Sequence, residues 1–381
     1  MSLSRTLSRL KRGRQTFAAA YPSPDLGPDT ATSPLQELNG FANPGNLRGL
    51  FHAPVRRGEP APLLVVLHGC TQDAASYDHG SGWSRLANRH GFVVLYPEQR
   101  RANNPNLCFN WYQRADAVRD RGEAASIAAM VDALKAQLAI DPDRVFVTGL
   151  SAGGAMTSVM LATYPDVFAA GAVIAGMPYA CASNLSEAFE CMAGRGQGDA
   201  QALAARVRAG SGHSGPWPRL SIWHGSADRI VAPSNAEALV KQWTGLHGLG
   251  TAPDRVEMID GHRRRVWLDR EGEELIEHFD VQDMAHGTPL MPGTGEGQSG
   301  QARAHMLDVG LSSTDRIAAF FGIGPEVTPS GGQITVAADP VSEPAKVERA
   351  PEPARYEGSA PSGGSVQQTI EDALRSAGLL R

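Results

Sequence analysis

A series of short apolar runs, bounded by Gly, Pro or polar residues, constrains the fold of this chain more than any other feature. Runs of this length that are rich in β-branched residues are typical of strands buried on both faces of a sheet. The predicted strands are Leu47–Pro54, Leu63–His68, Phe92–Tyr96, Val145–Gly149, Ala169–Gly176 and Leu220–His224, with Glu274–Asp280 as a further candidate.

Segments with helical periodicity lie between several of these runs. Glu123–Leu138 places Ile127, Val131 and Leu134 on one helical face. Ser234–Leu246 is a second predicted helix, for which Ser234 is the expected N-cap. Strands that alternate with helices of this length indicate an α/β fold, in which a mostly parallel central sheet carries helices on both faces.

The composition excludes several classes of protein. The 381 residues are 42% hydrophobic, which is ordinary for a globular protein with a large core. The net charge of -5 gives no signature of nucleic-acid binding, and no apolar run approaches the roughly 18 residues of a membrane span. The cysteines show no zinc-ligand spacing, so we expect no metal site; they are Cys70, Cys108, Cys181 and Cys191.

Composition also divides the chain into successive parts. Residues 1–46 form a polar arm, residues 47–324 hold the predicted strands and helices, and residues 325–364 have the composition of a flexible linker. Residues 365–381 have the capping and apolar spacing of a short helix. Residues 1–14 are basic, which suits an amphipathic helix or a solvated terminus, and no cleavable secretory signal is visible.

Gly149-Leu150-Ser151-Ala152-Gly153 is the strongest chemical signal. The pattern G-x-S-x-G occurs often by chance, but here a predicted buried strand precedes it and a helix-forming segment follows it. A sharp strand-to-helix turn would expose the Ser151 hydroxyl, and side chains at the flanking glycines would clash across the turn. The pattern therefore predicts Ser151 as a nucleophile.

A serine nucleophile needs a base, and a third group should orient that base. Asp228 follows the predicted strand Leu220–His224, and His286 follows Glu274–Asp280. Both residues therefore lie in loops at the edge of the sheet where the carboxyl ends of strands collect, as Ser151 does. We predict Asp228 as the supporting acid and His286 as the base.

Other residues could take these roles. Asp260 and His262 form another late acid–histidine pair, although their charged surroundings indicate an exposed hairpin turn. Asp283 could replace Asp228 as the acid. His224 lies inside an apolar run, which favours a packed or hydrogen-bonded structural role.

Acyl transfer by a serine also needs two N–H donors for the oxyanion. The residue after the nucleophile, Ala152, is one expected donor, and the loop after an early strand should provide the other. In that loop we choose the backbone N–H of Cys70. Trp111 and Tyr112 are expected to wall the acyl site, with core packing as the alternative, and Met177 is expected to line the pocket.

The cysteines have a further use. Cys181 and Cys191 lie ten residues apart in a loop-like segment after a strand and could close a small disulfide. The sequence leaves open whether this pair, or Cys70 and Cys108, is bonded.

Several motifs together resemble the polyhydroxybutyrate (PHB) depolymerase family of esterases. The likeness covers about residues 45–322 in the order of the family. It implies an α/β-hydrolase fold, and the serine, aspartate and late histidine that the family uses correspond to Ser151, Asp228 and His286. The motifs are LHGCTQ (67–72), CFNWY (108–112), GLSAGGAM (149–156), AGMPYACA (175–182), HGSADRIV (224–231) and DMAHGTP (283–289).

The resemblance implies a serine esterase that needs no cofactor and acts on short-chain esters, including hydroxyalkanoate polyesters. Three alternatives stay open: a feruloyl or acetyl esterase on polysaccharide, an acyltransferase, and a non-catalytic protein that binds polyester granules through residues 1–14 or 365–381. Many family members are secreted, whereas the sequence alone indicates the cytoplasm. Depolymerases of solid polymer usually carry an extra binding domain, and residues 325–381 are too polar and too short to form one. We therefore expect soluble esters with acyl chains of about two to six carbons to be better substrates than crystalline polyester.

Overall fold

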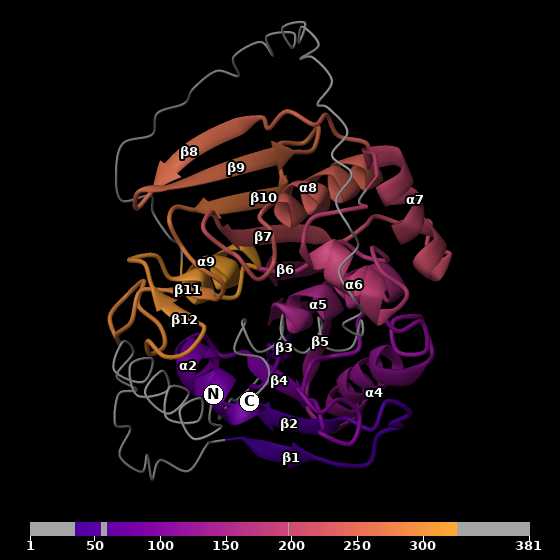
Figure 1. The fold of residues 1–381 in the computed structure, drawn as a ribbon. Coiled ribbons are helices and arrows are strands. Elements are labelled where there is room, and N and C mark those ends of the chain that lie inside the picture. Colours follow the sequence, from indigo (N-terminus) through magenta and orange to yellow (C-terminus); the bar gives the residue numbers. More distant parts are fainter. Residues whose placement is uncertain (1–34, 55–58, 197, 326–381) are drawn as a thin grey trace, which may run out of the picture. The chain divides into compact units, whose positions relative to one another are not determined.

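The structure, a computed structural model, describes residues 35–54, 59–196 and 198–325. Their main feature is a ten-stranded sheet with the strand order β1-β2-β4-β3-β5-β6-β7-β10-β9-β8 (Figure 1). The strands are β1 (Gln36–Leu38), β2 (Arg48–His52), β3 (Ala61–Leu67), β4 (Val93–Glu98), β5 (Ile140–Leu150), β6 (Ala170–Ile174), β7 (Arg219–Gly225), β8 (Arg255–Ile259), β9 (His262–Leu268) and β10 (Glu274–Val281).

The centre of the sheet is parallel and its edges are antiparallel. Strands β4, β3, β5, β6, β7 and β10 run in the same direction. Strands β2 and β1 continue the sheet on one side, and β9 and β8 on the other, with antiparallel pairing. A small parallel pair, β11 (Thr288–Leu290) and β12 (Met306–Asp308), lies outside this sheet.

Helices pack on both faces of the sheet and create two hydrophobic cores. Strand β5 shows why, because Val145 and Val147 pack in one core while Phe146 between them packs in the other. Helices α4, α5, α7 and α8 contribute to the first core, and α2, α3 and α9 to the second. The helices are α2 (Ala74–Ser81), α3 (Trp83–His90), α4 (Gly122–Gln137), α5 (Ala152–Thr163), α6 (Leu185–Met192), α7 (Ala200–Ser211), α8 (Ser234–His247) and α9 (Ser313–Phe320).

The predicted fold class is confirmed, and two local predictions need correction. Strand β1 pairs with β2, so the sheet begins inside the segment 1–46 that was predicted to be an arm. Ser234 is the first residue of α8 and not its N-cap, because Pro233 before it already has helical dihedral angles of φ -57° and ψ -21°. The predicted helix 365–381, and the predicted linker apart from Pro325, lie outside the described residues.

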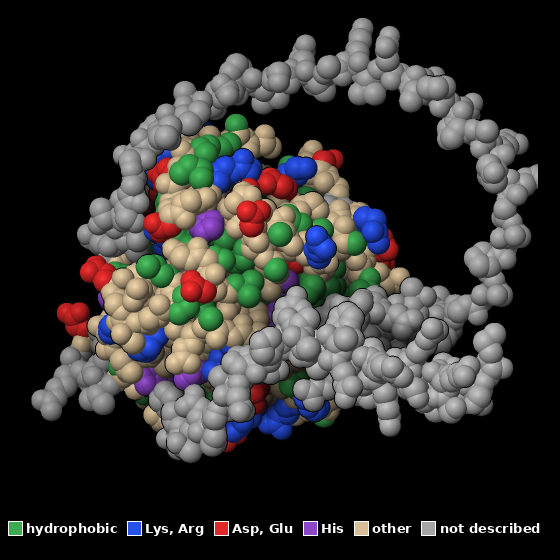
Figure 2. Space-filling model, turned by 60° about the vertical axis from the view of Figure 1, so that its left-hand side comes forward, with side chains coloured by type: hydrophobic (Ala, Val, Ile, Leu, Met, Phe, Trp, Pro, Cys, Tyr) green, Lys and Arg blue, Asp and Glu red, His purple; other side chains and the backbone are tan. Residues whose placement is uncertain are grey.

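Charged side chains of both signs lie interspersed on the face drawn in Figure 2. That face therefore offers no extended basic field of the kind that nucleic-acid binding requires. In the described part of the chain, no helix has both the length and the apolar character needed to cross a membrane.

Candidate active site

Ser151 lies at the sharp turn between β5 and α5. Its backbone has φ 57° and ψ -114°, and its N–H donates to the carbonyl oxygen of Ile174 at 2.9 Å. A Cβ atom on Gly149 would come within 2.4 Å of the Gly153 carbonyl oxygen, and one on Gly153 within 2.2 Å of the Leu67 carbonyl oxygen. The flanking glycines are thus required by close backbone packing, as the sequence predicted.

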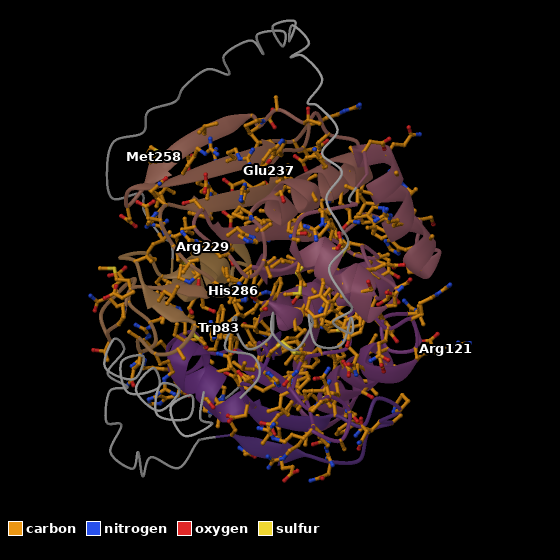
Figure 3. The ribbon with its side chains drawn as sticks, viewed as in Figure 1. Trp83, Arg121, Arg229, Glu237, Met258 and His286 are labelled. Carbon is orange, nitrogen blue, oxygen red and sulfur yellow. A yellow bond between two sulfur atoms is a disulfide. The ribbon has the colours of Figure 1, made fainter. Side chains whose placement is uncertain are left out.

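Asp228 and His286 meet in the loops that follow the adjacent parallel strands β7 and β10. Nδ1 of His286 lies 2.7 Å from Oδ2 of Asp228. The other carboxylate oxygen, Oδ1, accepts the backbone N–H groups of Ile230 at 2.8 Å and Val231 at 3.0 Å. The carboxylate is therefore held on one side by the backbone and orients the imidazole on the other. Figure 3 places His286 near the middle of the molecule.

His224 is a second imidazole beside Asp228. Its Nε2 donates to the Val231 carbonyl oxygen at 2.9 Å and lies 3.4 Å from Oδ2 of Asp228. Burial alone would raise the pKa of Asp228, but the hydrogen bonds from His224 and His286 outweigh burial and hold it well below its usual range. Asp228 therefore remains an anion that can stabilise a positive charge on His286.

The competing acid and histidine lie elsewhere. His262 was expected in an exposed turn, and it does follow the β8–β9 hairpin turn, but its side chain is buried. Nδ1 of His262 accepts the N–H of Gln282 at 3.1 Å, and Nε2 lies 3.1 Å from the Val309 carbonyl oxygen. Both ring nitrogens are thus occupied by backbone groups. Asp283 is exposed and makes no hydrogen bond to His286.

One cavity of about 250 Å³ gathers the remaining predicted site residues. Because Ser151 and His286 both line it, the candidate nucleophile and base face the same space. Trp111 and Met177 are also buried in the core, so the packing and pocket interpretations both apply to them. The predicted residues in the lining are Cys70, Trp111, Tyr112, Ser151, Ala152, Met177 and His286.

The sequence analysis missed part of the cavity wall. Helix α6 lies in the segment that was predicted to be loop-like, and its first turn is capped by Asn184, whose side chain accepts the N–H of Glu187 at 3.0 Å. The α6 residues that line the cavity have the sequence spacing of one helical face, and this is the signal that could have identified the helix. The additional lining residues are Asn104, Pro105, Asn106, Cys108, Leu185, Ala188, Phe189, Met192 and Ile230.

Two disulfides join segments that line the cavity. The bond between Cys181 and Cys191, which the sequence left open, is present and joins the segment before α6 to the last turn of α6. A second bond joins Cys70 to Cys108, which ties the candidate oxyanion loop to the loop that carries Trp111. The N–H of Cys70 makes no hydrogen bond to another described residue, so it is available to a ligand. Among the residues that the structure describes, no cluster of His, Cys, Asp or Glu side chains is arranged to hold a metal ion.

Comparisons with known proteins identify the family of the chain. The family model "Esterase PHB depolymerase" matches residues 48–263, more than half of the chain. The chain is 49% identical to poly(3-hydroxyalkanoate) depolymerase C of Paucimonas lemoignei over 291 residues, which is 76% of this chain and 70% of that protein. It is 34% identical to an acetylxylan esterase of Coprinopsis cinerea over 272 residues, covering 69% and 71% of the two chains.

A solved structure supports the same assignment. The acetyl xylan esterase from Aspergillus awamori superimposes with a TM-score of 0.65 and 26% sequence identity, covering 76% of this chain and 99% of that one. Together with the family match and the sequence identities, this likeness shows that the chain belongs to the esterase PHB depolymerase family, a group of carboxylic ester hydrolases with the α/β-hydrolase fold.

Proposed function

We propose that this chain hydrolyses oligoesters and polyesters of short hydroxyalkanoic acids through an acyl-enzyme on Ser151. The observation that carries the proposal is that Ser151 and His286 line one cavity while Asp228 holds His286 from behind. The lining is largely apolar and contains no Asp, Glu, Lys or Arg, which suits a short acyl chain. The 49% identity to a poly(3-hydroxyalkanoate) depolymerase favours polyesters over the acetyl esters named for the 34% identical relative.

In this mechanism the Ser151 hydroxyl attacks the ester carbonyl and His286 takes its proton at Nε2. The N–H groups of Cys70 and Ala152 bind the oxyanion of the tetrahedral intermediate. The carbon–oxygen bond to the alcohol then breaks, and the alcohol leaves with the proton from His286. A water molecule, activated by the same histidine, hydrolyses the acyl-enzyme and restores the serine.

The test compares wild type with Ser151→Ala on p-nitrophenyl butyrate, on 3-hydroxybutyrate oligomers, and on methyl ferulate and acetylated xylan. We expect wild type to prefer the first two substrates, and a fluorophosphonate probe to label Ser151. Preference for ferulate or acetylated xylan would favour the alternative esterase activities, and ester transfer to an added alcohol would favour an acyltransferase. Labelling that persists in Ser151→Ala would contradict the nucleophile assignment.

We also propose that residues 1–14 or 365–381, which lie outside the described residues, contact polyester granules. The basic residues of the first segment and the apolar spacing of the second support this. Co-sedimentation with amorphous granules should weaken when the contacting segment is removed. Binding by both truncated chains at the level of the full chain would contradict the proposal.

A further inference from the structure

A second cavity, of about 680 Å³, lies beside the candidate active site. The two cavities share Trp111 and Tyr112 in their linings. The segment closed by the Cys181–Cys191 disulfide also lines both, because Glu187 faces the second cavity and the next residue, Ala188, the first. The two cavities therefore adjoin at Trp111, Tyr112 and this segment.

The two cavities differ in charge. Glu187 is the only carboxylate among the described residues that line the second cavity, and it accepts the N–H and hydroxyl groups of Ser183. Three arginines line the same cavity, whereas none lines the first. The second cavity therefore carries a surplus of positive charge next to an uncharged, apolar one.

The three arginines are not equally available. Arg119 forms a two-pronged ion pair with Asp166, at 2.6 Å and 2.9 Å. Arg206 is partly buried, and among the described residues it donates only to the Ala180 carbonyl oxygen, at 3.2 Å, which leaves most of its donors unused there. Arg114 is exposed and makes no ion pair or side-chain hydrogen bond within the described part of the chain. Arg114 and Arg206 are thus the cations free to bind an anion.

Hydroxyacid oligomers have the complementary chemistry. Each has a hydroxyl group at one end and a carboxylate at the other. Whichever ester bond is hydrolysed, the acyl fragment keeps the hydroxyl end and the departing alcohol fragment keeps the carboxylate. An anion-binding site next to the reaction centre would therefore engage the departing fragment.

We propose that the second cavity binds the terminal carboxylate of a hydroxyalkanoate oligomer through Arg114 and Arg206 while one of its ester bonds lies at Ser151. This inference rests on the proposed function and adds a direction to it, since the oligomer is held by its acid end. Guanidinium groups suit this task because their paired N–H donors match a carboxylate. The enzyme should therefore favour short oligomers with a free acid over the same oligomers with the acid blocked.

The experiment measures kcat/KM for 3-hydroxybutyrate trimer as the free acid and as its methyl ester. Wild type should favour the free acid by about 10-fold, the effect of one hydrogen bond to a charged group, and the preference should shrink at high salt. Arg114→Gln and Arg206→Gln should each lower the ratio of the two values. Arg121→Gln is the matched control, because Arg121 is also exposed but does not line the cavity (Figure 3), and its ratio should equal that of wild type.

A wild-type ratio of one, or ratios that stay at the wild-type value in both cavity variants, would overturn this inference and leave the proposed function intact. Turnover of p-nitrophenyl butyrate without turnover of either trimer would overturn the proposed polyester activity, and this inference with it. Thermal unfolding of each variant shows whether a lower ratio of the two kcat/KM values reflects the lost arginine or a damaged fold.

Discussion

Nδ1 of His68 lies 2.7 Å from the carbonyl oxygen of Gly69. The other ring nitrogen, Nε2, accepts the N–H of Gln99 at 3.1 Å, so the ring proton is on Nδ1 and is donated to Gly69. Burial lowers the pKa of His68, which keeps the ring neutral. Because a peptide unit is planar and trans, the bond that fixes the Gly69 carbonyl also fixes the Cys70 N–H on the opposite side. His68 thereby orients the proposed oxyanion donor.

Replacement of His68 should therefore impair the chemical step more than substrate binding. In His68→Leu the Gly69 carbonyl keeps only the longer hydrogen bond from the Gln72 N–H, at 3.3 Å, so the Gly69–Cys70 peptide is held less firmly. We expect kcat to fall by about 10- to 100-fold, less than for complete loss of an oxyanion donor. His68→Asn can place an amide N–H near the position of Nδ1 and should retain more activity. Steady-state kinetics on p-nitrophenyl butyrate test this, and equal losses in both variants would contradict the positioning role.

The active-site elbow was predictable from sequence because its requirements are local. Gly149 and Gly153 flank Ser151 in the chain, and the same short segment supplies the strand and the helix. The burial of His262 was not predictable, since it depends on Gln282 and Val309, which are distant in sequence and reach it only in the folded chain. Contacts between residues that are distant in sequence cannot be predicted from a local sequence pattern.

The same reasoning explains what else the sequence left open or missed. Cys70 and Cys108 become neighbours only because β3 and β4 are adjacent in the sheet, which no local pattern specifies. Strand β1 is short and its first two residues are exposed, so it has no apolar run from which a strand could be predicted. Helix α6 did have a helical period, but the surrounding Cys, Gly and Pro residues favoured a loop interpretation.

His224 gives a second prediction, because it is the other imidazole near Asp228. In His224→Leu, Asp228 loses a neighbouring donor and the Val231 carbonyl loses its hydrogen bond, so we expect kcat to fall by about 10-fold with little change in KM. His224→Gln can restore an N–H donor and should recover part of the loss. The rate of fluorophosphonate labelling should be highest in wild type, lower in His224→Gln and lowest in His224→Leu. Full kcat in His224→Leu would show that Asp228 needs only His286 and the backbone.

The backbone of Ser151 gives a third prediction. A non-glycine residue at φ 57° and ψ -114° is strained, and glycine relieves that strain. Ser151→Gly should therefore unfold with a free energy about 1 kcal/mol higher than Ser151→Ala, although we expect both variants to be inactive. Ser158 in the middle of α5 is the matched control, because there glycine should be less stable than alanine by about 1 kcal/mol. Denaturant unfolding measures all four variants, and the same sign at both positions would contradict the argument from strain.

Glu123 is a buried carboxyl group behind the cavity wall. It is buried at the start of α4 and supports the loop that leads to Trp111. Its Oε2 accepts the N–H of Asn110 at 2.8 Å, and Oε1 accepts the side chains of Gln99 at 2.6 Å and Asn110 at 2.8 Å. Burial raises the pKa of Glu123 to about 8, although these hydrogen bonds oppose the shift.

A carboxyl group whose pKa is higher in the folded than in the unfolded chain contributes stability at low pH and loses it as the pH rises. We therefore compare the free energy of unfolding of wild type with that of Glu123→Gln, which does not titrate at this position. The difference, wild type minus variant, should fall between about pH 5 and about pH 8, by at most about 1.4 kcal/mol for each pH unit. A difference that stays flat over this interval would mean that Glu123 is already ionised in the folded protein, with the three hydrogen bonds outweighing burial.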